Sequence, residues 1–263
     1  MSSSADQTIA ALRSGHDDLS ARVGDLKPDD LVRPSAASEW NISQVLSHLG
    51  SGAVIGLATL EASLAGDPPP DGDFNKGVWA RWDAMTPQER AAGFTPANRQ
   101  LVERFEALDP TQRAELRVDL GFLPEPVDVA TAAAFRLSEF GYHAWDVKVA
   151  FEPAAAVAPE ATAVMLDRTA FMLGFIGRPE ALEGRHAAIA VRLTDPDRSF
   201  GLSLGDTITM TALPAQPDGE LRAPAEAWLR LAAGRLAPGY TPAGVSLTGP
   251  LDLDDLRRVF PGF

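Results

Sequence analysis

The spacing of apolar residues changes once along this chain, and that change limits the possible folds more than any other feature. Up to about residue 152, apolar side chains recur every three or four residues, as at Val45, Leu49 and Ala53, which is typical of amphipathic helices. From residue 186 onward apolar and polar residues alternate, which is typical of half-buried strands. The sequence therefore predicts an α+β fold with two domains, a helical one over 1–153 and a smaller α+β one over 154–263.

Turn and capping signals place the individual elements. Asn41, with Gln44 three residues later, predicts a capping box at the start of one helix, and Gly66 marks the end of that helix. Thr86 followed by Pro87 predicts another helix start. The other predicted helices are residues 5–24, 97–108, 128–151, 160–176, 224–233 and 252–260, and the predicted strands are 186–195, 199–206, 207–213 and 244–249.

The charge and the apolar segments of the chain exclude several classes of partner. Its 263 residues contain 23 Lys and Arg against 36 Asp and Glu, a formal charge of −13, which argues against nucleic acid and against anionic membrane surfaces. Residues 40–60 carry no charge and are long enough to span a bilayer, but polar residues crowd one half of this segment, which predicts a buried helix instead. The N-terminal segment MSSSADQTIAALRSG lacks the basic start and apolar core of a signal peptide, so we expect a cytoplasmic protein.

The sequence contains no cysteine. A disulfide framework, a cysteine-ligated zinc site and a cysteine nucleophile are therefore excluded. Any thiol chemistry at this protein requires a thiol from outside the chain.

Three residues on two predicted helices have the character of metal ligands. Glu139 and His143 lie four residues apart, so both side chains project from one helix face about one turn apart and can hold one divalent ion. A third ligand must come from another helix, and His48 is the natural candidate, since Gly52 and Gly56 follow at one-turn intervals and are expected to leave an open groove beside the imidazole. Such a set leaves open positions on the ion, which is typical of catalytic metal sites.

The three candidate ligands have a plainer interpretation, and so do several residues near them in the sequence. A Glu-x₃-His pair is a common surface contact on helices, and a single histidine on a helix flank is often no ligand. His16 lies on the apolar seam of its helix and either faces the same cavity as the ligands or, as we expect, packs in the seam. Asp146 is either a solvated acid or the hydrogen-bond partner of a ligand imidazole at His143. Four tryptophans of the helical half either wall a pocket or fill the core: Trp40, Trp79, Trp82 and Trp145.

Three segments of the chain together resemble a known family. SEWNISQVLSHL (38–49) and RLSEFGYHAWDV (136–147) are similar to the mycothiol-dependent maleylpyruvate isomerase family, whose N-terminal half is a DinB-like four-helix bundle. AEAWLRLAAGRL (225–236) resembles the Trp-Leu…Gly-Arg segment of that family's C-terminal domain, whose fold is like that of sterol carrier proteins. The resemblance covers nearly the whole chain.

The resemblance implies a ligand set, a cofactor and a substrate-binding residue. It implies that His48, Glu139 and His143 bind a divalent metal, usually zinc, and that mycothiol, a low-molecular-weight thiol, supplies the sulfur. It also implies that Arg235, in the Gly-Arg turn, binds or polarises an acidic substrate. A bound metal lowers the pKa of a thiol, so this chemistry suits a chain without cysteine. The ligand set alone also suits iron, nickel or manganese.

These features favour a metal- and mycothiol-dependent enzyme acting on a small electrophile. The thiolate either is transferred to the substrate or adds to a double bond, permits rotation and leaves, as in the cis–trans isomerisation of a maleylpyruvate-like acid. One alternative is a metal- or thiol-binding module without catalysis. Another is a protein whose C-terminal half holds an apolar molecule, although the short strands predicted there leave little room for one.

Overall fold

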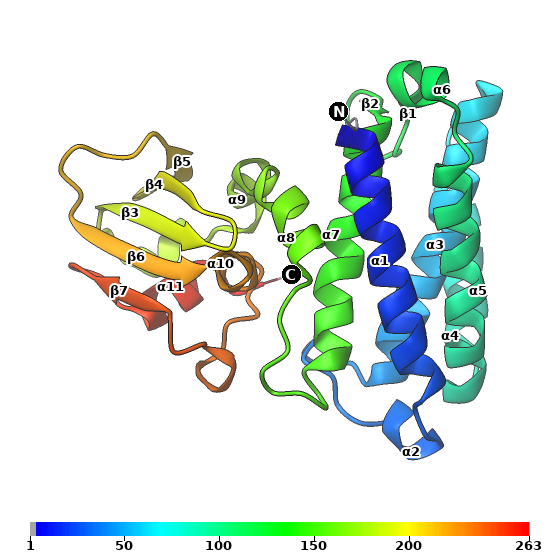
Figure 1. The fold of residues 1–263 in the computed structure, drawn as a ribbon, viewed down its shortest axis with the longest axis horizontal. Coiled ribbons are helices and arrows are strands. Elements are labelled where there is room, and N and C mark those ends of the chain that lie inside the picture. Colours follow the sequence, from blue (N-terminus) through cyan, green and yellow to red (C-terminus); the bar gives the residue numbers. More distant parts are fainter. Residues whose placement is uncertain (1–3, 263) are drawn as a thin grey trace. The chain divides into compact units, whose positions relative to one another are not determined.

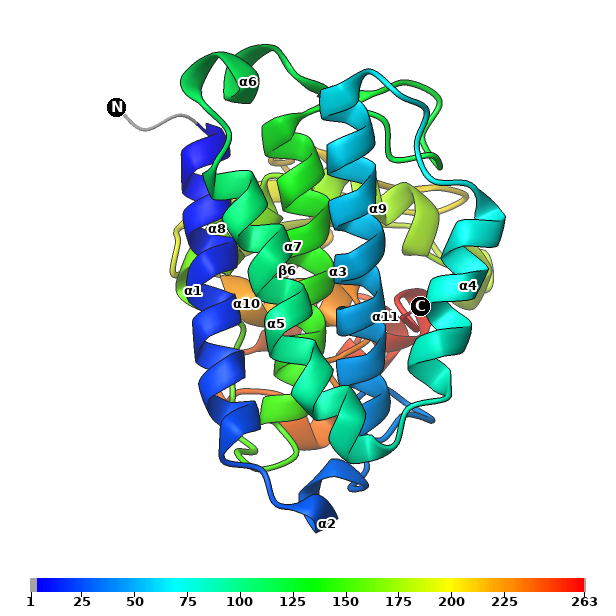
Figure 2. The same ribbon diagram turned by 90° about the vertical axis from the view of Figure 1, so that its right-hand side faces the viewer.

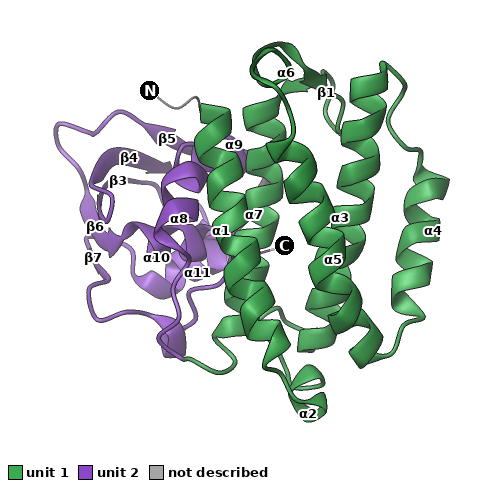
Figure 3. Ribbon diagram, turned by 45° about the vertical axis from the view of Figure 1, so that its right-hand side comes forward, with its two compact units in different colours: residues 1–152 green, residues 153–263 purple. Residues whose placement is uncertain are grey.

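The computed structural model describes residues 4–262. The chain divides into two compact units, residues 1–152 and residues 153–263 (Figure 3). The first unit is helical and the second combines a sheet with helices (Figure 1). The predicted α+β fold is therefore confirmed.

Four long helices form the body of the first unit (Figure 2). They are α1 (Ser4–Gly24), α3 (Ile42–Ala65), α5 (Pro87–Glu106) and α7 (Val129–Lys148). Helix α3 packs against α5 and α7, and α1 packs against α5 and α7, so the four enclose one core. The smaller elements are α2 (Pro28–Leu31), α4 (Gly72–Asp83), α6 (Pro110–Glu115), β1 (Arg117–Val118) and β2 (Val127–Asp128).

Local signals fix the ends of α3, the helix that carries His48. The Asn41 side chain accepts a hydrogen bond from the Gln44 N–H, and the Gln44 side chain accepts one from the Asn41 N–H, so the predicted capping box is confirmed. Gly66 ends the helix in the left-handed conformation that favours glycine, at φ 75°. Within the described residues, α3 is the one helix long and apolar enough to cross a membrane, and half of its most apolar window is buried within the structure.

Helix α5 differs from its prediction. It runs unbroken from Pro87 to Glu106 and includes Pro96, whereas the sequence pattern separated the start at Thr86 from a helix over 97–108. Packing explains the continuity, because Phe94, Asn98 and Leu101 on either side of the proline are all buried. The tertiary environment outweighs the local preference of proline to interrupt a helix.

The second unit is built on a five-stranded sheet in the order β5-β4-β3-β6-β7. Strands β3 and β6 pair in parallel and all other neighbours are antiparallel. The strands are β3 (Ala187–Thr194), β4 (Arg198–Leu204), β5 (Ile208–Thr211), β6 (Gly219–Pro224) and β7 (Ser246–Thr248). The helices are α8 (Pro159–Leu166), α9 (Thr169–Ile176), α10 (Ala225–Ala232) and α11 (Leu253–Val259), with short 3₁₀ turns η1 (Pro179–Leu182) and η2 (Pro238–Tyr240).

The prediction of one helix over 160–176 is wrong, because α8 and α9 are separate helices. Between them the Arg168 N–H donates to the Met165 carbonyl, a tight turn of the 3₁₀ type. The Thr169 hydroxyl also donates to that carbonyl, at 3.3 Å. The carbonyl that would continue α8 is thus satisfied locally, and the helix ends.

Candidate metal centre

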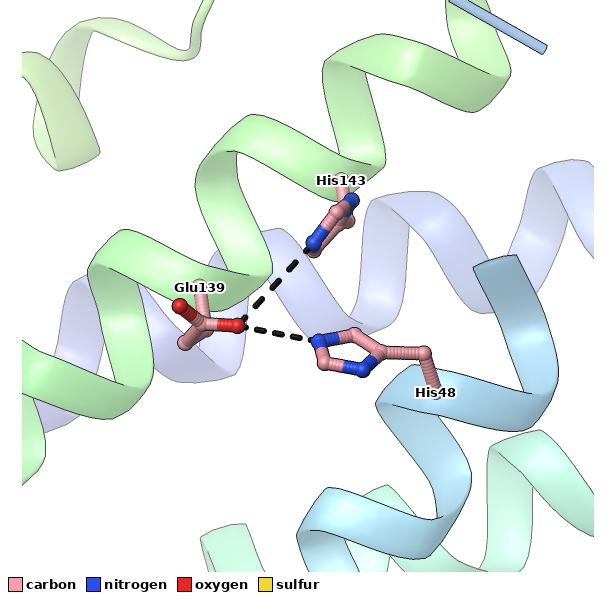
Figure 4. Close-up of side chains that lie close together, drawn as sticks. All are labelled: His48, Glu139 and His143. Atoms are coloured by element: carbon pink, nitrogen blue, oxygen red, sulfur yellow. Dashed lines mark hydrogen bonds and ion pairs between the residues drawn. The ribbon is translucent and has the colours of Figure 1, made fainter. Parts of the chain in front are cut away.

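The three predicted ligands converge inside the first unit (Figure 4). His48 projects from α3, and Glu139 and His143 project from the same face of α7. Glu139 Oε2 lies 2.9 Å from His48 Nε2 and 4.0 Å from His143 Nε2. One ligand atom from each residue lies within 4.8 Å of the other two, so the three atoms surround a common point.

This geometry fits a divalent cation. Zinc binds imidazole nitrogen and carboxylate oxygen at about 2.0–2.2 Å, which puts neighbouring ligand atoms of a tetrahedral site about 3.4 Å apart. The observed separations of 2.9 and 4.0 Å bracket that value. Two imidazoles and one carboxylate fill three positions, so a fourth stays open for a ligand from outside the chain.

The electrostatic surroundings keep Glu139 ionised. Burial acts to raise the pKa of this carboxyl, but the hydrogen bond with His48 and the electrostatic interactions with His48, His143 and Arg136 outweigh it and lower the pKa to about 2. Glu139 is therefore an anion at neutral pH, the form that a cation requires.

Asp146 orients one of the imidazoles. It is fully buried, at 0% exposure, and its Oδ2 accepts a hydrogen bond from His143 Nδ1 at 2.9 Å. This bond holds the His143 proton on Nδ1 and leaves the Nε2 lone pair directed toward Glu139. Of the two interpretations of Asp146, the solvated acid is wrong and the partner of His143 is confirmed.

Trp40 lies beside both histidines. Its ring centroid is 5.2 Å from that of His48 and 5.9 Å from that of His143, on which it stacks. The preceding residue, Glu39, has φ 71°, a left-handed conformation that costs a non-glycine residue roughly 1–2 kcal/mol. The loop is held to α7 by the Ala36 N–H, which donates to the Asp146 carbonyl. Of the four tryptophans, Trp40 therefore lines the site, whereas Trp82 and Trp145 are buried and Trp79 is exposed.

The expected open groove along α3 is wrong. A side chain at Gly52 would meet Arg136 Nη1 at 3.0 Å, and one at Gly56 would meet Leu101 at 3.2 Å, so neighbouring side chains already occupy both positions. His16 packs as expected, 2% exposed, with its Nδ1 2.9 Å from Asp17 Oδ1. It does not belong to the three-residue cluster.

Arg136 is the residue near the site that the sequence interpretation missed. It lies three residues before Glu139 and seven before His143, so the three positions share one face of α7. This spacing is visible in the sequence and places Arg136 on the same helix face as the predicted ligands, but it does not show where the guanidinium ends.

Arg235 lies in the second unit, in the turn that follows α10. It is 8% exposed, its N–H donates to the Arg230 carbonyl at 2.6 Å, and its Nη1 donates to the Ala233 carbonyl at 3.0 Å. The cluster of His48, Glu139 and His143 lies wholly within the first unit. The role of Arg235 toward a substrate stays a prediction.

Comparison with known proteins shows the family and agrees with the fold. Residues 12–148 match the family model described as the mycothiol maleylpyruvate isomerase N-terminal domain. A crystal structure of the mycothiol-dependent maleylpyruvate isomerase is similar at a TM-score of 0.66 and 14% identity, covering 95% of this chain and 98% of that chain. A histidine-to-alanine mutant of that enzyme gives a TM-score of 0.65 at 13% identity, with the same coverage. No curated protein sequence matches the chain.

Proposed function

This chain belongs to the mycothiol maleylpyruvate isomerase family, and from that premise we propose that it is a metal-dependent enzyme that uses mycothiol on a small electrophilic substrate. The observation that carries the proposal is the convergence of His48, Glu139 and His143, which fits a divalent ion, zinc in the first instance. When bound, such a cation lowers the pKa of a thiol, so that a nucleophilic thiolate exists at neutral pH. The chain has no cysteine to supply that thiol itself.

The protein's own residues hold and orient the centre. His48 and His143 offer their Nε2 atoms, Glu139 supplies the negative charge, and Asp146 fixes the His143 proton on Nδ1. The Trp40 ring covers one side of the imidazole pair and restricts the space in which a substrate is placed. Glu139 and His48 remain partly exposed, at 43% and 35% of their side chains, so small molecules reach the centre from their side.

The reaction we propose is addition of the thiol sulfur to an electrophilic carbon. With a carbon–carbon double bond, addition, rotation and loss of the same thiol give the geometric isomer, whereas retention of the sulfur gives an S-conjugate. Arg235 is the residue we propose to bind an acidic substrate, on the strength of its match to the family's Gly-Arg turn. We place the enzyme in the cytoplasm, with a thiol and a small molecule as its partners.

Metal content and thiol-dependent turnover test this proposal together. We expect about one zinc ion per chain by elemental analysis, and consumption of maleylpyruvate or another electrophile only when mycothiol is added. His48→Ala and Glu139→Gln should each lower metal affinity at least about 100-fold and abolish turnover. His186→Ala, in an exposed histidine of the second unit, is the matched control and should change neither.

Two results would count against the enzyme. Full turnover without added thiol overturns the mycothiol requirement. Stoichiometric metal binding without turnover of any electrophile in a panel supports the alternative, a non-catalytic metal- and thiol-binding module.

A further inference from the structure

Arg136 carries a positive charge into the bundle beside the candidate metal centre. Its Nη2 donates to the Leu49 carbonyl at 2.7 Å and to Asn98 Oδ1 at 2.5 Å, so the side chain reaches from α7 across α3 to α5. Leu49 follows His48 directly in the chain. Arg136 thus lies within one helical turn of ligands on both helices.

Both hydrogen-bond acceptors of this guanidinium are neutral. Among the described residues, no carboxylate lies within 4.0 Å of Arg136 in an ion pair, and its Nε and Nη1 atoms make no hydrogen bond. Burial lowers the pKa of Arg136 to about 10, while Glu139 acts in the opposite direction. The group is still charged at neutral pH, and a partly buried cation without a paired anion is costly to keep.

The fold makes room for this side chain. A Cβ at position 52 would lie 3.0 Å from Arg136 Nη1, which is closer than ordinary van der Waals contact, so glycine there allows the guanidinium to approach α3. Its Cζ also lies 5.9 Å from the centroid of the Phe140 ring. The guanidinium therefore has a defined position, with two sets of N–H donors left over.

We propose that Arg136 binds a carboxylate of the electrophilic substrate. The inference rests on the proposed function, since it assigns a further substrate-binding residue to the same site. With a divalent cation bound, the cation and Arg136 carry three positive charges against the two carboxylates of Glu139 and Asp146, which favours an anionic ligand despite the formal charge of −13 on the whole chain. Each free N–H group of the guanidinium can donate one charge-assisted hydrogen bond to a carboxylate oxygen. Arg136 is thus a specificity-determining residue within the first unit, separate from Arg235.

Binding of a dicarboxylate probe to the zinc-loaded full chain tests this assignment. Maleate and its neutral dimethyl ester are titrated into the wild type and the variants by calorimetry, without thiol. We expect Arg136→Met to weaken maleate binding at least about tenfold, which is the loss of one charge-assisted contact, and to leave the ester unaffected. Arg136→Lys keeps the positive charge and loses the planar guanidinium. Its affinity for maleate should therefore lie between that of the wild type and that of Arg136→Met.

Two further variants separate recognition from a structural role. Gly52→Ala displaces the guanidinium without removing it and should weaken maleate binding as well, so the test stands even if Arg136→Met does not fold. Arg104→Met removes a partly exposed arginine that is paired with Glu61 and should bind maleate like the wild type. With an acidic electrophile, Arg136→Lys should raise KM more than it lowers kcat.

The assignment is overturned if the wild type does not bind maleate, if it binds the ester equally well, or if folded Arg136 variants bind maleate like the wild type. Zinc content, measured on the same samples, separates this failure from that of the proposed function. A wild type that retains no zinc after loading refutes the metal centre. Maleate binding is then measured on the zinc-free chain, where a loss on Arg136→Met still supports the role of Arg136. Arg136 variants that retain zinc and no longer bind maleate support both the metal centre and the assignment of Arg136.

Discussion

Arg230 is buried on a helix of the second unit and Arg136 is half-buried on a helix of the first, and the two guanidiniums are satisfied in different ways. In the second unit Arg230, 2% exposed, donates to both carboxylate oxygens of Glu226 at 2.7 and 2.8 Å and to the Tyr240 carbonyl at 2.8 Å. In the first unit Arg136 donates only to a backbone carbonyl and to an amide oxygen. The charge of Arg230 is neutralised within the fold, whereas that of Arg136 is not.

This difference separates structural charge from functional charge. A buried ion pair with complete hydrogen bonding costs desolvation energy once and then holds its element in place. A charge left without its counterion is tolerated where a ligand completes it, and such groups gather at functional sites. In the second unit Arg230 and Glu226 neutralise each other, and the first unit leaves Arg136 and Glu139 available around the candidate centre.

The largest effect is expected when one partner of the Arg230–Glu226 ion pair is removed. Arg230→Met leaves Glu226 as a mostly buried carboxylate without its partner, so the free energy of unfolding of the second unit should fall by about 3–5 kcal/mol. Chemical denaturation followed by circular dichroism measures this loss.

The double variant Glu226→Leu/Arg230→Met is the control. It removes both charges and should recover much of the stability, because no unpaired group is left buried. Arg136→Met, in contrast, leaves no such partner and should destabilise its unit less. Equal losses from the two arginine variants would erase the distinction between the units.

The sequence predicted the convergence of His48, Glu139 and His143 better than the surroundings of these residues. Glu139 and His143 share a face because of helical periodicity, which local spacing determines, and the Asn41 cap is equally local. The groove at Gly52 could not be judged in the same way, because the residue that fills it, Arg136, comes from another helix. A long side chain reaches a site through tertiary packing, which periodicity does not report.

The second unit shows the same limit. The alternation over 186–213 predicted strands β3, β4 and β5, whereas β6 was missed. Its sequence, GELRAP, contains no β-branched or aromatic residue, and it pairs in parallel with β3, about 30 residues away. Its strand conformation depends on that distant partner more than on its own composition.

A smaller effect is expected at the residue that orients the metal ligand. Asp146→Asn removes the carboxylate that accepts the His143 proton, and an asparagine amide in its place permits the other tautomer. Loss of such a partner lowers metal affinity by about 10- to 100-fold. Competition with a chromophoric zinc chelator measures the affinity, and Asp255→Asn, at a buried carboxylate of the second unit, is the matched control. Unchanged affinity would show that Asp146 serves the fold alone, as the closed charges of the second unit do.

The smallest effect concerns pH. Hydrogen bonds from Arg185 lower the pKa of Asp255 to about 2, against burial and with help from Arg258. Because the pKa in the folded state lies below the ordinary value of 3.8, this carboxylate stabilises the fold above about pH 4, and the contribution is lost as the pH falls toward 2. The wild type should therefore exceed Asp255→Asn in stability at neutral pH by up to about 1 kcal/mol, since Arg185 is partly exposed and solvent screens the pair.

Zinc distinguishes this carboxylate from Glu139, whose pKa is also about 2. The stability difference between the wild type and Asp255→Asn should disappear below pH 2 and should be the same with and without zinc, because the partners of Asp255 are arginines of its own unit. The stability difference between the wild type and Glu139→Gln should, in contrast, depend on zinc. Zinc should stabilise the wild type and not the variant, since a ligand that binds only the folded state raises its stability in proportion to its affinity. A zinc-dependent difference at Asp255, or none at Glu139, would contradict the assignment of one carboxylate to the fold and the other to a ligand.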